Sequence, residues 1–526
     1  MPLQTFIDKI SKEVQAIEKT ILTAWWDLAT SGEEKYAKAM EEGNVALRKL
    51  YASPENYQFL SSQPNPKDPL LDRQRTLLLY QFKENQIPID MIEQITSLET
   101  EIEAIYTNFR PSINAEAISN NDLKKILVES NDSKERQQAW EASKAIGEQV
   151  DAKVKKLISL RNAAAKKSGF QDFYSMRLEL QEIDQNKLFK LLEDLYHLSN
   201  PTWQQYKEQL DQSLSERFQI PLEKIMPWHY QDPFFQEAPT QKLDMDTFYK
   251  DKDIVGISND FYNNIGLPVS DVLGRSDLFE RDKKNQHAFC INIDRKQDVR
   301  ILCNLRDNEY WMATQLHELG HAVYDKNIDQ KLPFLLRTPA HTSTTEAIAM
   351  LFGRLSKDRS FLKRYIGLND EKANEINGAI QKQTAANLLV FARWTLVMIY
   401  FERAMYQQPE TDLNKLWWDY VNKFQSVNAV PGRNKPDWAS KLHLACAPVY
   451  YQNYLLGEMT ASQLLHYIDE ILKSTNSNFC ESTLVGDYLR KRLFAIGSKY
   501  PWDETLEHVT GEKLSPNYFS NDVAKL

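Results

Sequence analysis

The chain has 526 residues, with 42% hydrophobic and 26% charged residues and a formal net charge of −9 at pH 7. This is the composition of a globular protein with room for two or three domains or one large two-lobed enzyme. The acidic balance, without a long basic run, argues against nucleic acid as a partner. Glycine is scarce at 16 residues, whereas Glu, Lys, Gln, Leu and Ala are frequent, which favours helices over sheets.

Neither the N-terminus nor the most apolar segment predicts a membrane protein. The first residues, MPLQTFIDKISKEVQAIEK, contain no apolar stretch followed by a cleavage site, so we expect no secretory signal. The most apolar segment, residues 385–400, has Arg393 in its middle and Glu402 just after it. These charges predict a buried core helix rather than a membrane span. The four cysteines form no C-x-x-C pair and indicate reduced thiols, so we expect a cytoplasmic protein.

Helical periodicity dominates the N-terminal half of the chain. Apolar residues from Ile7 to Trp25 recur at helical spacing. A loop that contains several prolines follows at residues 61–69. Helical patterns then continue over about residues 70–214.

The segment at residues 226–239, MPWHYQDPFFQEAP, interrupts this pattern. Its three prolines and four aromatic residues predict an ordered connector rather than a flexible linker. We place a soft domain boundary here, with a mainly helical N-terminal lobe over residues 1–225 and a catalytic lobe over residues 226–526. We expect the two lobes to be interleaved.

Two short strands are predicted next. Phe289, Ile291 and Ile293 alternate with period two, and the same alternation runs from Val299 to Leu305. After these strands, Asp307 or Asn308 can cap the start of a new helix.

That helix carries the pattern H-E-x-x-H. His317 and His321 are four residues apart, so their imidazoles project from one face and can share one Zn²⁺ ion per chain. Glu318 can reach a water molecule beside the metal and act as general base. A chance match is expected in roughly one such chain in a hundred, so we interpret the pattern as a zinc site.

A catalytic zinc site needs a third protein ligand and one open position. Glu346 lies 25 residues after His321, at the start of the apolar segment EAIAMLFGRL. Alternatively, its carboxylate could lie at the start of a helix only because a negative charge there interacts favourably with the helix dipole. Given the motif upstream, we favour the ligand role.

The arrangement HELGH followed by TTEAIA resembles the gluzincin peptidases related to angiotensin-converting enzyme. AWWDLATSGEEKYAKAMEEGNVALRKLY is similar to that family's helices that cover the cleft, HAFCINIDRKQDVRI to its hairpin, and SKLHLACAPVYYQNYL to its substrate-binding segment. APVYYQNYL is also similar to thimet oligopeptidases. The resemblance implies an all-α, two-lobed peptidase with a deep central cleft and one small antiparallel sheet beside the zinc helix.

The resemblance also implies roles for individual residues. His287 would bind a substrate carbonyl and the Ala288 backbone would pair with the peptide. Lys441 would bind the terminal carboxylate of the peptide, and His443 the substrate backbone or the oxyanion. The remaining candidates are Tyr454 for the oxyanion, Tyr451 for the carboxylate with Tyr450 as its rival, and Gln231 as a further carboxylate contact.

The sequence departs from the family's pattern in two places. Four residues after the third ligand the family has an acid that orients a zinc histidine, whereas this chain has Met350. The arginine that binds chloride in the family has no counterpart near Gln452 and Asn453. We therefore do not expect chloride activation.

Three functions remain in competition. The first is a peptidyl-dipeptidase that releases dipeptides from the free C-termini of short peptides. The second is a thimet-type oligoendopeptidase that cuts internally. The third is an inactive peptide-binding protein, which the intact zinc motif disfavours. In each case we expect a short peptide as partner, no membrane, and a chain that acts as a monomer.

Overall fold

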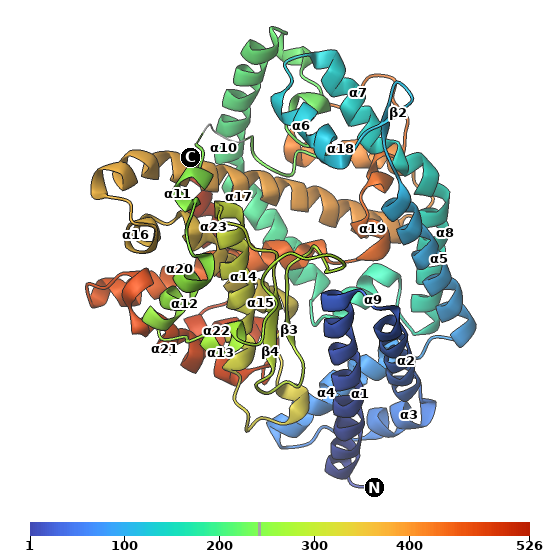
Figure 1. The fold of residues 1–526 in the computed structure, drawn as a ribbon. Helices are drawn as coiled ribbons and strands as arrows, with labels where there is room; N and C mark the ends of the chain where they lie inside the picture. The colour runs from blue at the N-terminus through green and yellow to red at the C-terminus, as the bar shows by residue number, and fades with distance from the viewer. Residues whose placement is uncertain (240–242) are drawn as a thin grey trace. The chain divides into compact units, whose positions relative to one another are not determined.

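A computed structural model describes residues 1–239 and 243–526 (Figure 1). This part of the chain is mostly α-helical with two small antiparallel sheets, which confirms the predicted all-α class. The helices of the first half are α1 (Leu3–Ser31), α2 (Glu34–Tyr51), α3 (Pro54–Ser62), α4 (Pro69–Glu84), α5 (Ile89–Asn108), α6 (Asn120–Glu129), α7 (Ser133–Lys144), α8 (Ile146–Lys167), α9 (Phe173–Leu180), α10 (Gln185–Phe218), α11 (Asp246–Tyr249) and α12 (Ile254–Asn264). Those of the second half are α13 (Ser270–Leu273), α14 (Glu309–Lys326), α15 (Thr342–Gly353), α16 (Arg359–Phe361), α17 (Asp370–Gln407), α18 (Leu413–Gln425), α19 (His443–Cys446), α20 (Tyr451–Ser474), α21 (Thr483–Arg492), α22 (Trp502–Thr510) and α23 (Pro516–Val523).

The chain forms two compact units, each assembled from three segments. Unit 1 comprises Met1–Gln86, Leu243–Ile380 and Leu456–Phe519, and unit 2 comprises Ile87–Lys242, Gln381–Leu455 and Ser520–Leu526. The boundary expected near residue 225 lies inside unit 2. Periodicity could not locate the crossings at 380 and 455, because they fall within the continuous helices α17 and α20.

The predicted strand pair is present in unit 1. β3 (Phe289–Asn292) pairs antiparallel with β4 (Val299–Leu302), and Phe289 lies opposite Leu302. Both strands are shorter than the alternating pattern. Asp277 adds a parallel bridge to Leu302 on the other edge of β4.

A second sheet, in unit 2, was not predicted. β1 (Ser112–Ile113) pairs with β2 (Glu116–Ala117) through a turn in which Asn114 and Ala115 both have positive φ. Two-residue strands are too short to show a period-two pattern, so periodicity could not predict them.

The apolar segment at residues 385–400 lies in α17. Within the described residues, α17 is one helix long and apolar enough to cross a membrane by length and composition, and 78% of its apolar window is buried inside the protein. Arg393 is also buried, and it donates a hydrogen bond to Ser199 Oγ at 2.9 Å. This burial is what the expected core helix requires.

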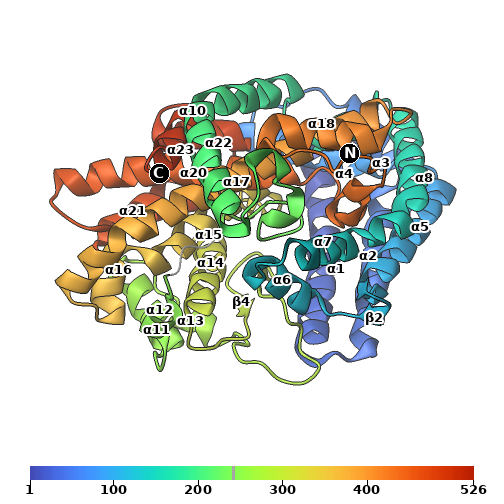
Figure 2. The same ribbon diagram turned by 90° about the horizontal axis from the view of Figure 1, so that it is seen from above.

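The connector at residues 226–239 is ordered, as predicted. The fully buried guanidinium of Arg136 donates to the backbone carbonyls of Trp228, His229 and Tyr230 at 2.8–3.1 Å. His229 accepts a hydrogen bond from the Met226 N–H through Nδ1, so its role is structural. Elsewhere in unit 2, α5 and α8 run side by side in both views (Figures 1 and 2).

Candidate active site

The helix that carries H-E-x-x-H, α14, begins as the sequence predicts. Asn308 is its N-cap, and the Asn308 side chain accepts a hydrogen bond from the Trp311 N–H at 2.9 Å. The face of α14 turned into the core of unit 1 carries Leu316, Leu319 and Val323, all fully buried. Burial of this face fixes the orientation of α14, and the two histidines project from the opposite side of the helix.

The predicted third ligand lies on α15, which packs directly against α14. His341 is the N-cap of α15, and its Nδ1 accepts from the Ser343 N–H, so this histidine is structural. The two helices approach closely at Gly320, where a Cβ atom would lie 2.9 Å from the Cα of Ala349. Glycine at this crossing therefore allows Glu346 to approach the histidines.

The three predicted ligands converge. Glu346 Oε2 lies 3.8 Å from His317 Nε2 and 4.0 Å from His321 Nε2. The candidate ligand atoms all lie within 4.8 Å of one another. In a tetrahedral zinc site such atoms are separated by about 3.3 Å. The three ligand atoms would therefore need to move only slightly closer together to bind one zinc ion. The arrangement fits a metal bound by two imidazoles and one carboxylate.

Electrostatics also suits a metal. Burial lowers the pKa of His317 to about 4 and that of His321 to about 3, so both imidazoles are neutral at physiological pH and have lone pairs to donate. Burial raises the pKa of Glu346 to about 7. Burial, assisted by the charge of Glu346, also raises the pKa of Glu318 to about 8. A cation between these groups would relieve the cost of the two buried carboxylates.

The structure identifies what holds the imidazoles in place of the acid expected at Met350. His321 Nδ1 lies 2.7 Å from Thr345 Oγ1. His317 hydrogen-bonds the backbone of Ala349, which raises the pKa of that histidine against the effect of burial. A partner on the far side of each ring fixes its orientation toward the metal. Sequence reasoning missed both, since it looked for an acid at one position.

We expect Thr345→Val to weaken metal binding while leaving the fold intact. Valine keeps the shape of threonine but cannot hydrogen-bond Nδ1 of His321, and loss of such a partner typically costs about 10–100-fold in metal affinity. Competition with a chromogenic chelator measures the change. Thr342→Val, at the exposed start of α15, is the matched control and should leave affinity unchanged. Equal affinities for the two variants would show that Thr345 does not orient the ligand.

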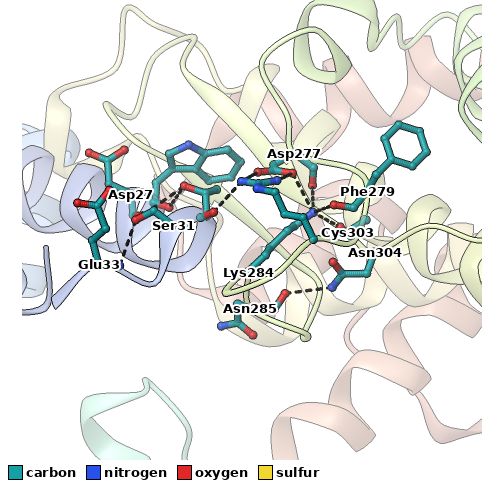
Figure 3. A network of polar contacts seen from close by, with 12 residues as sticks. Asp27, Ser31, Glu33, Asp277, Phe279, Lys284, Asn285, Cys303 and Asn304 are labelled. Atoms are coloured by element: carbon teal, nitrogen blue, oxygen red, sulfur yellow. Dashed lines mark hydrogen bonds and ion pairs between the residues drawn. The ribbon is translucent and has the colours of Figure 1, made fainter.

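The predicted peptide-binding pair, His287 and Ala288, directly precedes β3 and follows a loop built around Lys284 (Figure 3). The fully buried Lys284 ammonium donates to the carbonyls of Asp277, Phe279 and Cys303 and pairs with the Asp277 carboxylate at 2.9 Å. A lysine with all its donors used in this way holds the loop rigidly.

The same loop is tied to neighbouring elements of unit 1. The Asn285 N–H donates to the Ala29 carbonyl near the end of α1. Asn304 donates to the Asn285 carbonyl (Figure 3). The exposed His287 and the half-buried Ala288 therefore start from a fixed backbone at one end of β3.

The other predicted substrate residues lie in unit 2, where Lys441 has a defined environment. Lys441 Nζ donates to Gln236 Oε1 at 2.8 Å and lies 5.1–5.9 Å from the ring centroids of Phe234, Trp394 and Tyr451. Burial lowers the pKa of Lys441 to about 8, against the charges of Asp232 and Glu237. We call Lys441, Gln236 and Tyr451 the carboxylate subsite, after the role that the resemblance implies for Lys441.

Gln236, five residues after the predicted Gln231, is the glutamine that accepts a hydrogen bond from Lys441. The buried carboxylate of Asp232 accepts hydrogen bonds from the N–H groups of Phe234, Gln236 and Glu237 at 2.8–3.1 Å. This turn carries Gln236 to Lys441. The resemblance implied a contact for Gln231 and gave no sign of Gln236, because irregular backbone gives no fixed relation between sequence offset and side-chain direction.

The tyrosines and His443 form a cluster in unit 2. The Tyr451 hydroxyl accepts a hydrogen bond from Trp394 Nε1 at 3.3 Å, and its ring centroid lies 5.1 Å from that of His443. The Tyr454 ring lies 5.5 Å from that of Tyr451 and 5.0 Å from that of Tyr450. The ring of Tyr451, the favoured candidate for the carboxylate, thus lies next to both Lys441 and His443. Among the described residues, the buried Nδ1 of His443 has no hydrogen-bond partner.

Comparison with known proteins gives a consistent result. A family model described as angiotensin-converting enzyme matches residues 2–518. An angiotensin-converting enzyme-like protein of Mus musculus is 21% identical over 96% of this chain and 73% of its own length. Thermostable carboxypeptidase 1 of Pyrococcus furiosus is 21% identical over 72% of this chain and 75% of its own. Carboxypeptidase 1 of Bacillus subtilis is 22% identical over 44% of this chain and 50% of its own length. Because the family model matches almost the whole of this chain, the chain belongs to the angiotensin-converting enzyme family of zinc metallopeptidases.

Proposed function

We propose that one Zn²⁺ ion per chain, held by His317, His321 and Glu346, serves the hydrolysis of short peptides. Two neutral imidazoles and a carboxylate are the donor set of catalytic zinc sites, in which a fourth position stays open. Zinc bound there would polarise the scissile carbonyl and make a water molecule acidic near neutral pH. Every other part of the reaction falls to side chains of the chain itself.

Glu318 is the proposed proton carrier. It adjoins His317 in sequence and is not one of the three converging ligands, so its carboxylate is available to take a proton from the attacking water and return it to the leaving amine. A carboxyl group with a raised pKa is a stronger base than an exposed one. We assign Tyr454 and His443 to hydrogen bonds with the oxyanion, and His287 with the Ala288 backbone to the substrate chain.

We further propose that the enzyme releases dipeptides from free C-termini. The observation that carries this proposal is the carboxylate subsite, where a half-buried ammonium group lies beside an amide and a phenol ring. Such a set of donors suits a carboxylate, because charge-assisted hydrogen bonds are strongest where water is excluded. Two of the relatives are named carboxypeptidases, and that name also favours action at a free C-terminus.

A cleavage map of one peptide and its C-terminally amidated twin tests the proposal. We expect successive dipeptides from the free acid and slow turnover of the amide, with both activities lost on chelation and restored by zinc. Release of single residues would make the enzyme a carboxypeptidase in the strict sense. Internal cuts at equal rates in both peptides would identify an oligoendopeptidase of the thimet type.

Zinc affinity should depend on pH through Glu346. Since burial raises its pKa to about 7, the metal-free site holds a proton on Glu346 below that pH, and this proton must leave before the carboxylate can bind. Affinity should therefore be highest above pH 7 and fall by about tenfold per pH unit as the pH drops below it. Titration from pH 8 to 5.5 measures this. Glu346→Gln should bind zinc weakly at every pH without this dependence, and a wild-type affinity that does not change below pH 7 would contradict the role of Glu346.

A further inference from the structure

Val449 has an unusual backbone conformation close to the carboxylate subsite. It lies between α19 and α20, two residues before Tyr451, and its φ is 54°. Positive φ is a rare outlier for a β-branched residue, because Cβ and its branches crowd the backbone. Such a conformation persists only where the surroundings enforce it, and it is concentrated at functional sites.

Buried side chains supply that enforcement. Glu402, on α17, is 2% exposed, and its Oε1 accepts a hydrogen bond from the Val449 N–H at 2.8 Å. The Val449 carbonyl accepts from Gln452 Nε2 at 2.6 Å and from Gln181 Nε2 at 3.1 Å. Both backbone polar groups of Val449 are thus held, and the Val449 side chain is itself buried.

The conformation of Val449 determines how α20 begins. Successive residues of an α-helix are rotated by about 100°, so a shift of one residue at the helix start would exchange Tyr451 for Tyr450 on the face toward Lys441. The sequence offers both tyrosines, with Tyr451 favoured and Tyr450 as its rival. In the structure Tyr451 accepts from Trp394 and lies near Lys441, whereas Gln452 and Asn453 point inward to Val449 and Gln181.

We propose that Glu402 is a positioning residue that holds Val449 in the left-handed conformation and thereby selects Tyr451 for the carboxylate subsite. This inference rests on the proposed function for its effect on substrate choice, but not for the conformation itself. In this role Glu402 acts through the backbone of Val449, which it contacts directly.

The carboxyl group of Glu402 needs only an acceptor oxygen for this role. Burial raises its pKa to about 8, and the hydrogen bond from Val449 opposes that shift. A neutral side chain of the same shape should therefore suffice. Glutamine at this position keeps an acceptor, whereas leucine keeps the volume and removes the acceptor, which leaves the buried Val449 N–H unpaired.

The test compares Glu402→Gln, Glu402→Leu and two double variants that add Val449→Gly or Val449→Ala to Glu402→Leu. Glycine adopts positive φ without steric cost, whereas alanine keeps the steric cost and still shortens the side chain. Two properties are measured on the zinc-loaded enzyme. They are the ratio of kcat/KM for a free-acid peptide to that for its amidated twin, and the hydrogen–deuterium exchange of residues 447–453.

Glu402→Gln should behave as the wild type. Glu402→Leu should accelerate exchange and reduce the ratio by about tenfold, as expected when a buried N–H loses its acceptor. The glycine double variant should recover most of the ratio, and the alanine double variant should not. A general loss of stability would not discriminate between glycine and alanine in this way.

Two results would overturn the inference: unchanged exchange and ratio in Glu402→Leu, or equal recovery by glycine and alanine. A wild type that does not distinguish the two peptides would refute the proposed dipeptide release instead. In that case the exchange of Glu402→Leu and its glycine partner still decides whether Glu402 holds Val449.

Discussion

Glu318→Gln should lose nearly all peptide hydrolysis while its metal content remains that of the wild type. Glutamine has almost the size and shape of glutamate, so α14 and the neighbouring ligands should keep their positions. An amide cannot take a proton from water and return it to an amine. The loss in kcat should therefore match the contribution of a general base, about 10²–10⁴-fold.

The position of Glu318 makes this test specific. It is 7% exposed, and the metal ligands His317, His321 and Glu346 converge without it. If Glu318 were instead a ligand, its substitution would lower zinc affinity together with turnover. Measurement of zinc content and of kcat on the same samples separates these two roles.

Asp325→Asn provides a matched control on the same helix. Asp325 is another carboxyl of α14 whose pKa burial raises, to about 7, and it lies one turn beyond His321. The same change of acid to amide there should preserve most turnover, because Asp325 is not among the converging ligands. If Glu318→Gln retained near-normal kcat, the proton would have to be carried by another group.

Those parts of the site that lie within one helix could be predicted from the sequence. His317 and His321 are one turn apart, and Glu318 follows from the same spacing, so helical periodicity alone orients all three. The prediction of Glu346 as the third ligand required the assumption that α15 packs against α14. The structure shows that this packing is possible because the two helices approach closely at Gly320.

Where the backbone is irregular, sequence spacing could not predict direction. Gln236 was not predicted, because the Asp232 carboxylate folds residues 232–237 into a turn that brings Gln236 to Lys441. The proposed selection of Tyr451 over Tyr450 likewise depends on Val449, whose positive φ no residue pattern would suggest. In both places a buried carboxylate that accepts backbone N–H groups sets the local conformation.

Lys441→Met should abolish the preference for peptides with a free C-terminus. The ammonium of Lys441 lies in the carboxylate subsite, bonded to Gln236 and surrounded by aromatic rings. Methionine fills a similar volume without the charge. Loss of one partner from a desolvated charge pair costs about 2–5 kcal/mol, which corresponds to a decrease in kcat/KM of roughly 30- to 4,000-fold for a free-acid peptide.

The amidated twin decides what that decrease means. An amide has no carboxylate to lose, so Lys441→Met should reduce its kcat/KM only slightly, and the two substrates should become nearly equivalent. Lys435→Met removes a half-exposed lysine that pairs with Glu148, and should change neither value. Zinc content should stay constant in both variants, since Lys441 belongs to unit 2 and the metal ligands to unit 1. Equal losses for the free acid and the amide would mean that Lys441 contacts the peptide backbone instead. The carboxylate subsite would then be part of an extended groove, and the enzyme an oligoendopeptidase.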